Sequence, residues 1–206
     1  MQQNYRPPIT KHGNKTFTRI IETAKKLFAE QGYLTTSINT IIEKSNIATG
    51  TFYIYFDDKL SLYKYILAEY KTKIREHLRK ATEDCKTRYE MEREGIKAFI
   101  KFAYEDPLSY NIIWESLFIN REIFQDYYEQ FAQRYILGLE AAKTELEEID
   151  LETLAYILMG IANFVGLQVI FKKNNKIKLS DKDFDFYTDQ IMRLLRSGIF
   201  LDKNQK

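Results

Sequence analysis

The chain has 206 residues, of which 45% are hydrophobic and 29% are charged, and its formal net charge is +2. This composition is ample for a packed core in one or two domains. The single cysteine, Cys85, excludes an internal disulfide framework and fits a reducing compartment.

The sequence also predicts the absence of a membrane segment. We find no apolar run of the roughly 18 residues needed to cross a bilayer. The longest candidate, Leu154 to Ile170, is interrupted by Asn163 and Gln168. The N-terminus lacks the basic-then-apolar order of a signal peptide. We therefore expect a cytoplasmic protein with no membrane association.

Charge is distributed unevenly along the chain. Residues 1–60 contain eight Lys or Arg and five acidic residues, a net charge of +3, whereas residues 61–206 carry a net charge of −1. A modestly basic head on a near-neutral body is typical of a nucleic-acid-binding head.

The spacing of apolar residues predicts an all-α fold. Apolar positions recur mostly every three or four residues, and the chain has only three prolines and eight glycines. Pro7-Pro8 and Gly13 are unsuited to a helix interior, so residues 1–13 are expected to form a mobile arm and the first helix to begin near Lys15 or Thr16. Gly32 should end this helix. About nine helices are expected, the last running to about Phe200.

A helix-turn-helix arrangement is predicted between Ser37 and Lys59. Ser37 to Lys44 is typical of a short helix with Ile38, Ile41 and Ile42 on one side. Asn46 tolerates the positive φ that a tight turn needs. The following short helix would enter the major groove of DNA.

Physical roles can be assigned along this second helix. Thr49 and Thr51 place short hydroxyls at its N-terminal end, which usually meets base edges. Gly50 lets the backbone approach DNA closely. Phe52 and Phe56 are four residues apart and should fix the helix on its neighbours.

Three later residues suit the DNA backbone. The Tyr53 and Tyr55 hydroxyls could reach phosphates, although half-buried packing is the alternative for both. Lys59 would offer a point charge to a phosphate. Thr36 and Ser37 could cap the preceding helix, and its N-terminus could also donate N–H groups to a phosphate.

Residues Phe17 to Tyr65 resemble the DNA-binding domain of the TetR family of repressors. The resemblance is carried by Ile20-Ile21, Ala24, Leu27-Phe28, Glu30, Gly32-Tyr33, Thr36-Ser37-Ile38, Ile41, Ile47 to Phe56, Lys59 and Leu62. The sequence departs from the family pattern at Ile42, Ser45 and Asn46. The resemblance implies a helix-turn-helix DNA-binding domain at residues 14–60 and an effector-binding and dimerisation domain at residues 61–206. It also implies DNA contacts at Thr36, Ser37, Thr49, Gly50, Thr51, Tyr53, Tyr55 and Lys59.

The body of the chain is rich in aromatic residues, which can form either a core or the lining of a ligand cavity. The resemblance implies a pocket for a small, largely hydrophobic effector. A fatty acyl compound or a hydrophobic drug would suit the composition. The candidate pocket residues are Phe102, Tyr110, Trp114, Phe118 and Asn163.

Small residues lie beside apolar ones in the last two predicted helices. They suit either intramolecular packing or a twofold interface, and the resemblance implies a homodimer through helices near 151–171 and 181–200. Two recognition helices would then read a palindromic operator on double-stranded DNA. The small and apolar residues in question are Ala155, Gly160, Ala162, Gly166, Met192, Leu195, Gly198 and Ile199.

These features predict a DNA-binding transcriptional regulator, most simply a repressor that a hydrophobic effector releases from its operator. The alternative is a regulator of the same fold without an effector, controlled by a protein partner or acting as an activator. An enzyme is not expected. The chain has only two histidines and lacks a Walker A run, a dinucleotide fingerprint and paired Cys/His ligands. We therefore expect no catalytic residues, no cofactor and no metal site.

Overall fold

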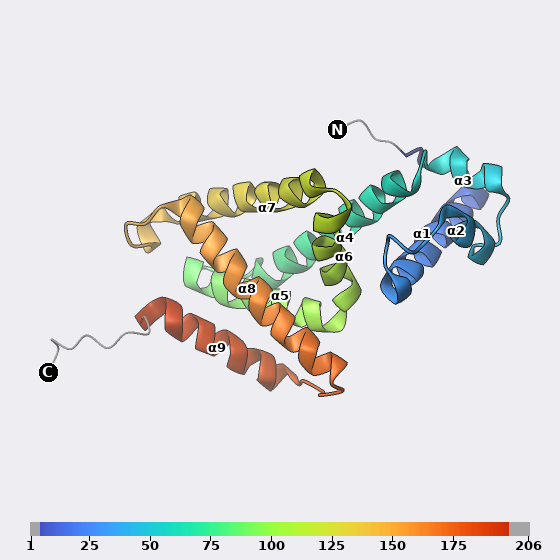
Figure 1. The fold of residues 1–206 in the computed structure, drawn as a ribbon. Helices are drawn as coiled ribbons and strands as arrows, with labels where there is room; N and C mark the ends of the chain where they lie inside the picture. Colours follow the sequence, from blue (N-terminus) through green and yellow to red (C-terminus); the bar gives the residue numbers. More distant parts are fainter. Residues whose placement is uncertain (1–4, 198–206) are drawn as a thin grey trace, which may run out of the picture. The chain divides into compact units, whose positions relative to one another are not determined.

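A computed structural model describes residues 5–197 of the chain. Over this range the fold is all-α, as predicted, with nine α-helices, one 3-10 turn (η1) and no strand beyond a single isolated β-bridge (Figure 1). The predicted extension of the last helix to Phe200 lies outside the described residues. The helices are α1 Lys11–Gln31, α2 Ile38–Lys44, α3 Thr49–Tyr55, α4 Lys59–Thr82, α5 Arg88–Glu105, α6 Pro107–Ile119, α7 Arg121–Ala141, η1 Lys143–Glu145, α8 Leu151–Asn174 and α9 Asp181–Ser197.

The chain forms two compact units. The first contains the chain up to Lys73 together with Leu108–Tyr127, and the second contains Ile74–Pro107 together with the chain from Tyr128 onward. This division does not follow the predicted boundary at residue 60. The first part of α4 belongs with the N-terminal helices because Tyr63, which is fully buried, packs edge-on against Tyr33 at 5.0 Å. The functional roles assigned to residues 14–60 and 61–206 remain predictions.

The start of α1 differs from the prediction. The helix begins at Lys11, because Thr10 is its N-cap and accepts a hydrogen bond from the Gly13 N–H at 3.0 Å. Gly13 therefore lies within the first turn. The residues before the helix are not a free arm from Tyr5 onward, since Tyr5 forms an antiparallel bridge with Phe56. The end of α1 is as predicted, with Gly32 as C-cap at φ +83°.

The core of the first unit holds α3 in place. Phe52 and Phe56 are both fully buried. Phe56 stacks on Phe17 of α1 with ring centroids 5.2 Å apart, and it meets Tyr65 of α4 at 6.0 Å. The predicted anchoring of the recognition helix on its two neighbours is confirmed.

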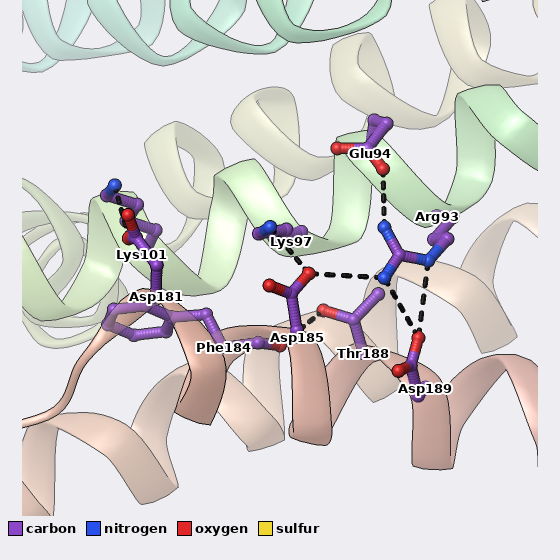
Figure 2. A network of polar contacts seen from close by, with 9 residues as sticks. All are labelled: Arg93, Glu94, Lys97, Lys101, Asp181, Phe184, Asp185, Thr188 and Asp189. Carbon is purple, nitrogen blue, oxygen red and sulfur yellow. Dashed lines mark hydrogen bonds and ion pairs between the residues drawn. The ribbon is translucent and has the colours of Figure 1, made fainter.

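In the second unit, α5 packs against α8 and α9. One buried cluster joins the three helices and contains Ile96, Ile100, Val169, Phe184, Ile191 and Met192. Three bases of α5 face three acids of α9 at the edge of this cluster, and the two helices run antiparallel (Figure 2). The ion pairs join Arg93 to Asp189 at 3.0 Å and to Asp185 at 3.1 Å, Lys97 to Asp185 at 2.5 Å, and Lys101 to Asp181 at 2.7 Å.

Helix α8 corrects the expectation that no segment is long and apolar enough to cross a membrane. It has 24 residues, and an 18-residue window within it has a mean hydropathy of 2.0, properties that core helices of soluble proteins share. Of the two polar residues in this run, Asn163 does not break the helix, because its side-chain amide donates to the Met159 carbonyl at 2.7 Å. Only 33% of its apolar window is buried.

Candidate nucleic-acid interface

Helices α2 and α3 form the predicted helix-turn-helix. Ser37 caps α2, and its hydroxyl accepts from the Thr40 N–H at 3.0 Å. Ile41 and Ile42 are buried on one side of α2. Asn46 takes the predicted positive φ, 51°, in the turn that leads to α3. The sequence therefore folds locally as its cap, apolar spacing and turn residue indicate.

Helix α3 has a buried face and an exposed face. Phe52 and Tyr55 are its buried residues. Residues three and four apart share a face of a helix, which places Gly50, Tyr53 and Ile54 together on the other side. Tyr53 is 47% exposed and Ile54 is 59% exposed. We call Thr49, Gly50, Tyr53 and Ile54, all exposed to solvent, the exposed face of α3. Thr51 is only partly exposed.

Gly50 has no structural role that requires a glycine. Its φ is not positive, and a Cβ placed there would meet no other atom within 4 Å. Glycine is a poor helix former, so the fold alone would favour a larger residue at this position. The absence of a side chain thus leaves open space beside Tyr53 and Ile54.

Tyr55 packs into the first unit, which is the alternative that the sequence offered beside a phosphate contact. It is 8% exposed and meets the Phe17 ring edge-on at 5.3 Å. Its hydroxyl donates to the Gly13 carbonyl at 3.4 Å. The spacing already carried this signal, because Tyr55 follows Phe52 by three residues and so shares the buried face.

The Lys59 ammonium points into the first unit. It donates to the carbonyls of Tyr33 and Thr36, both at 2.7 Å, and lies 4.2 Å from the centroid of the Tyr33 ring. Burial lowers the pKa of Lys59, and the negative charge of Glu115 acts in the opposite direction. Two carbonyl acceptors and an aromatic face favour the ammonium form. Lys59 therefore stabilises the turn between α1 and α2.

Thr36 is committed to the same turn. It is fully buried, and its hydroxyl donates to the Gly32 carbonyl at 2.8 Å. The Thr36 side chain cannot face DNA in this structure, in contrast to the exposed Ser37 beside it. Thr36 and Lys59 therefore hold the turn that positions Ser37, and Ser37 is the residue that is exposed there.

Helix α6 also holds this turn, through a contact that sequence reasoning missed. The Glu115 carboxylate accepts a hydrogen bond from the Tyr33 N–H at 2.6 Å, across 82 residues of sequence. Tyr63 donates its hydroxyl to the Ile112 carbonyl of α6. Burial raises the pKa of Tyr63, and the Glu115 charge adds to the rise. No local pattern signals these contacts, because they depend on tertiary packing.

Three of the predicted effector residues lie in α6, in the first unit. Tyr110 is 3% exposed, and its ring centroid is 6.3 Å from that of Trp114. Trp114 in turn lies 6.1 Å from Phe124. Burial raises the pKa of Tyr110. Phe118 is 80% exposed and does not join this aromatic group.

The other two predicted effector residues lie in the second unit. Phe102 is 5% exposed, and its ring centroid is 5.5 Å from that of His77. Asn163 is partly buried and accepts a hydrogen bond from the Tyr128 hydroxyl at 3.4 Å. The five predicted pocket residues are therefore divided between the two units. No group of three or more His, Cys, Asp or Glu side chains suited to a metal ion occurs within residues 5–197.

The chain is all-α, its N-terminal part is basic, and its helix-turn-helix exposes one face of the second helix. These features define the class of helix-turn-helix DNA-binding proteins. Residues 20–66 match the family model for bacterial regulatory proteins of the tetR family. This match covers the helix-turn-helix region of the chain and α1 before it.

Curated relatives and solved structures are also similar to this chain. The chain is 48% identical over 54 residues to the uncharacterized HTH-type transcriptional regulator YuxN of Bacillus subtilis, covering 26% of this chain and 19% of that protein. It is 28% identical over 122 residues to an HTH-type transcriptional regulator of Staphylococcus aureus (strain USA300), covering 55% of this chain and 65% of that protein. The chain thus spans less than two thirds of either relative. The transcriptional regulator FadR from Bacillus subtilis, solved in complex with stearoyl-CoA, has a similar fold, with a TM-score of 0.69, 18% identity, and coverage of 89% of this chain and 100% of that one.

Proposed function

We propose that the protein is a cytoplasmic, homodimeric repressor that binds a palindromic operator and is released when a small hydrophobic effector binds it. The observation that carries this proposal is the exposed face of α3. This face combines hydroxyl groups with the apolar Ile54 and lacks a side chain at Gly50. Phe52 and Tyr55 are buried on the opposite side of the helix and hold it in the first unit.

The proposed DNA contacts follow from exposure. Ser37 at the start of α2 and Thr49 at the start of α3 offer hydroxyls to phosphates or base edges. Tyr53 offers a hydroxyl from a side chain that is 47% exposed. Ile54 joins this set, because its apolar side chain suits the C5-methyl group of a thymine in the major groove. Thr51 remains a contact at the edge of the face.

A homodimer is supported by the exposed apolar side chains of the second unit. Ile157, Phe164 and Phe171 follow one another at intervals of seven residues along α8, and Phe164 is 67% exposed. A Cβ at Gly160 would meet nothing within 4 Å, so a second copy could approach closely there. On α9, Phe186 is 60% exposed. A homodimer carries two α3 helices, the number needed to read two half-sites about one helical turn apart.

A long-chain acyl compound is the effector class that we propose. Ligand cavities between helices are lined mainly by apolar and aromatic side chains, and Tyr110, Trp114 and Phe124 form such a group. A structure of similar fold binds stearoyl-CoA, which is a property of that protein.

The route from effector to DNA would run through α6. This helix carries both Tyr110 and Trp114 and the Glu115 carboxylate that holds the Tyr33 N–H. A ligand that displaces α6 would move the turn from which α2 begins. The size of the response is limited by the difference in effector affinity between the two conformations.

The test is operator selection with the purified protein from a random double-stranded library, followed by titration of the selected complex with stearoyl-CoA. We expect a palindromic sequence, and binding that weakens steeply with salt. Acyl-CoA should lower operator affinity. Binding without sequence preference would refute the proposed function. Specific binding that acyl-CoA leaves unchanged would refute the effector class alone.

A further inference from the structure

The residues before α1 lie along the C-terminal end of α3. Tyr5 pairs with Phe56, and the Arg6 backbone N–H donates to the Tyr55 carbonyl at 2.8 Å. The Arg6 guanidinium donates to the Tyr53 carbonyl at 3.3 Å and to the Asp57 carboxylate at 2.7 Å. We call residues 5–10 the N-terminal strap.

These contacts fall where a helix needs partners. The last carbonyls of an α-helix have no N–H donor within the helix. In α3, the carbonyls of Tyr53 and Tyr55 instead accept hydrogen bonds from Arg6. A positive charge near a helix C-terminus also interacts favourably with the helix dipole. The need is acute in α3, which has only seven residues, because helices this short are marginal without external support.

The strap is anchored on both sides of Arg6. The Tyr5 ring meets the Tyr65 ring of α4 edge-on at 4.8 Å. On the other side, a Cβ at Gly13 would lie 3.2 Å from both Pro8 Cβ and the Tyr55 hydroxyl. Glycine at this position therefore lets the strap and α3 close on the first turn of α1.

We propose that Arg6 is a positioning residue for DNA binding, which acts by fixing the half of α3 that carries Tyr53 and Ile54. This inference rests on the proposed function, in which α3 reads DNA. The Arg6–Asp57 pair is largely exposed, with side chains 61% and 49% accessible, and adds little by itself. The effect comes from the hydrogen bonds to the helix carbonyls.

The experiment compares Arg6→Gln with Arg6→Lys, and uses Arg121→Gln as a control with the same charge change at an exposed position of α7. The first readout needs no DNA: amide hydrogen exchange across Tyr53 to Phe56 by NMR. Arg6→Gln removes the side-chain bond to the Tyr53 carbonyl and keeps the backbone bond to Tyr55, and should speed exchange about three- to tenfold, the range for losing one hydrogen bond. Arg6→Lys should give a smaller change, and Arg121→Gln none.

The second readout is affinity for the selected operator over a series of salt concentrations. Arg6→Gln should weaken binding by a similar factor while the slope of log K against log salt stays as in the wild type. Asp57→Asn, which keeps the bond to the Tyr53 carbonyl, should bind at least as well as the wild type.

Three results would overturn the proposal. Unchanged exchange in Arg6→Gln would show that Arg6 does not stabilise α3. Faster exchange with unchanged operator affinity would show that this stabilisation does not affect DNA binding. Weaker binding with unchanged exchange and a slope lowered by about one would make Arg6 a phosphate contact instead. A wild-type protein that selects no operator would refute the proposed function. The exchange measurement would still show whether Arg6 stabilises α3.

Discussion

Replacing Gly50 by alanine should make the protein more stable and a weaker DNA binder. The added methyl group enters open space, since no atom lies within 4 Å of the position it would occupy. Alanine is favoured over glycine in a helix by about 0.5–1 kcal/mol. For a chain of this length, 1 kcal/mol corresponds to about 2–4 °C in Tm, so we expect a rise of about 1–4 °C.

The same methyl group lies on the exposed face of α3, where it would keep the DNA backbone at a distance. We expect a loss of about tenfold in operator affinity, equivalent to about 1.4 kcal/mol. Stability is best followed by the fluorescence of Trp114, the single tryptophan, because it lies in the same compact unit as α3. Operator affinity is measured by fluorescence anisotropy with a labelled duplex.

Gly95→Ala on α5 is the matched control for this substitution. A Cβ there meets only Thr82 Cγ2 at 3.6 Å, an ordinary contact, so this variant should also gain stability and keep its operator affinity. A Gly50→Ala protein that binds the operator as well as the wild type would refute close DNA approach at Gly50. A less stable Gly50→Ala protein would refute the open-space argument.

Further substitutions test the other surfaces. Tyr53→Ala should weaken operator binding at least tenfold with an unchanged circular dichroism spectrum, because the side chain is 47% exposed. Replacing the operator thymines one at a time by deoxyuridine should weaken wild-type binding severalfold at one position per half-site, and Ile54→Ala should abolish this sensitivity. Phe164→Glu should abolish the proposed dimer and give a monomer in light scattering, because it places a charge on an apolar face that is 67% exposed at this residue. Lys97 holds the pKa of Asp185 below its ordinary value. The stability that the ionised Asp185 contributes is therefore complete above about pH 3.9, the ordinary aspartate pKa. It falls as the pH drops through the lower pKa that Asp185 has in the folded state. In acid denaturation, Asp185→Asn should flatten this pH dependence of stability.

Each of these predictions has an outcome that contradicts it. Tyr53→Ala with unchanged affinity would remove Tyr53 from the interface. A wild-type protein that binds every deoxyuridine-substituted operator as tightly as the unsubstituted one would exclude the methyl contact proposed for Ile54. A Phe164→Glu protein that stays dimeric would place the interface elsewhere, and an acid transition identical in Asp185→Asn would show that this carboxylate is not responsible.

Local chemistry made much of the first unit predictable. Ser37 as a cap, the positive φ of Asn46, and the anchoring by Phe52 and Phe56 each follow from residue type and helical spacing. Tyr55 could have been placed correctly by the same spacing. These features need only short-range information, and the matched family pattern covers the same residues.

The contacts made by Lys59, Thr36 and Arg6 were not predictable in this way. Each side chain is polar, and Lys59 and Thr36 lie in the stretch with a DNA-binding pattern, yet each bonds to backbone carbonyls within the first unit. Which carbonyls are left without a helical partner depends on where helices end and what packs on them. The Glu115 contact with the Tyr33 N–H adds a sequence separation of 82 residues, which no local pattern reports.

The ion pairs between α5 and α9 repeat every four residues on both helices. Because of this regularity, similar pairs could form in more than one register of α9 along α5. If α9 moved by one turn, about 5.4 Å, so that Asp181 faced Lys97 and Asp185 faced Arg93, two of the three bases would still have an acidic partner. Electrostatic pairing therefore selects α9 as the partner of α5 but favours the observed register by only one paired base. That choice belongs to the shape of the buried side chains, above all Phe184, whose ring fits beside Tyr104 with centroids 5.5 Å apart.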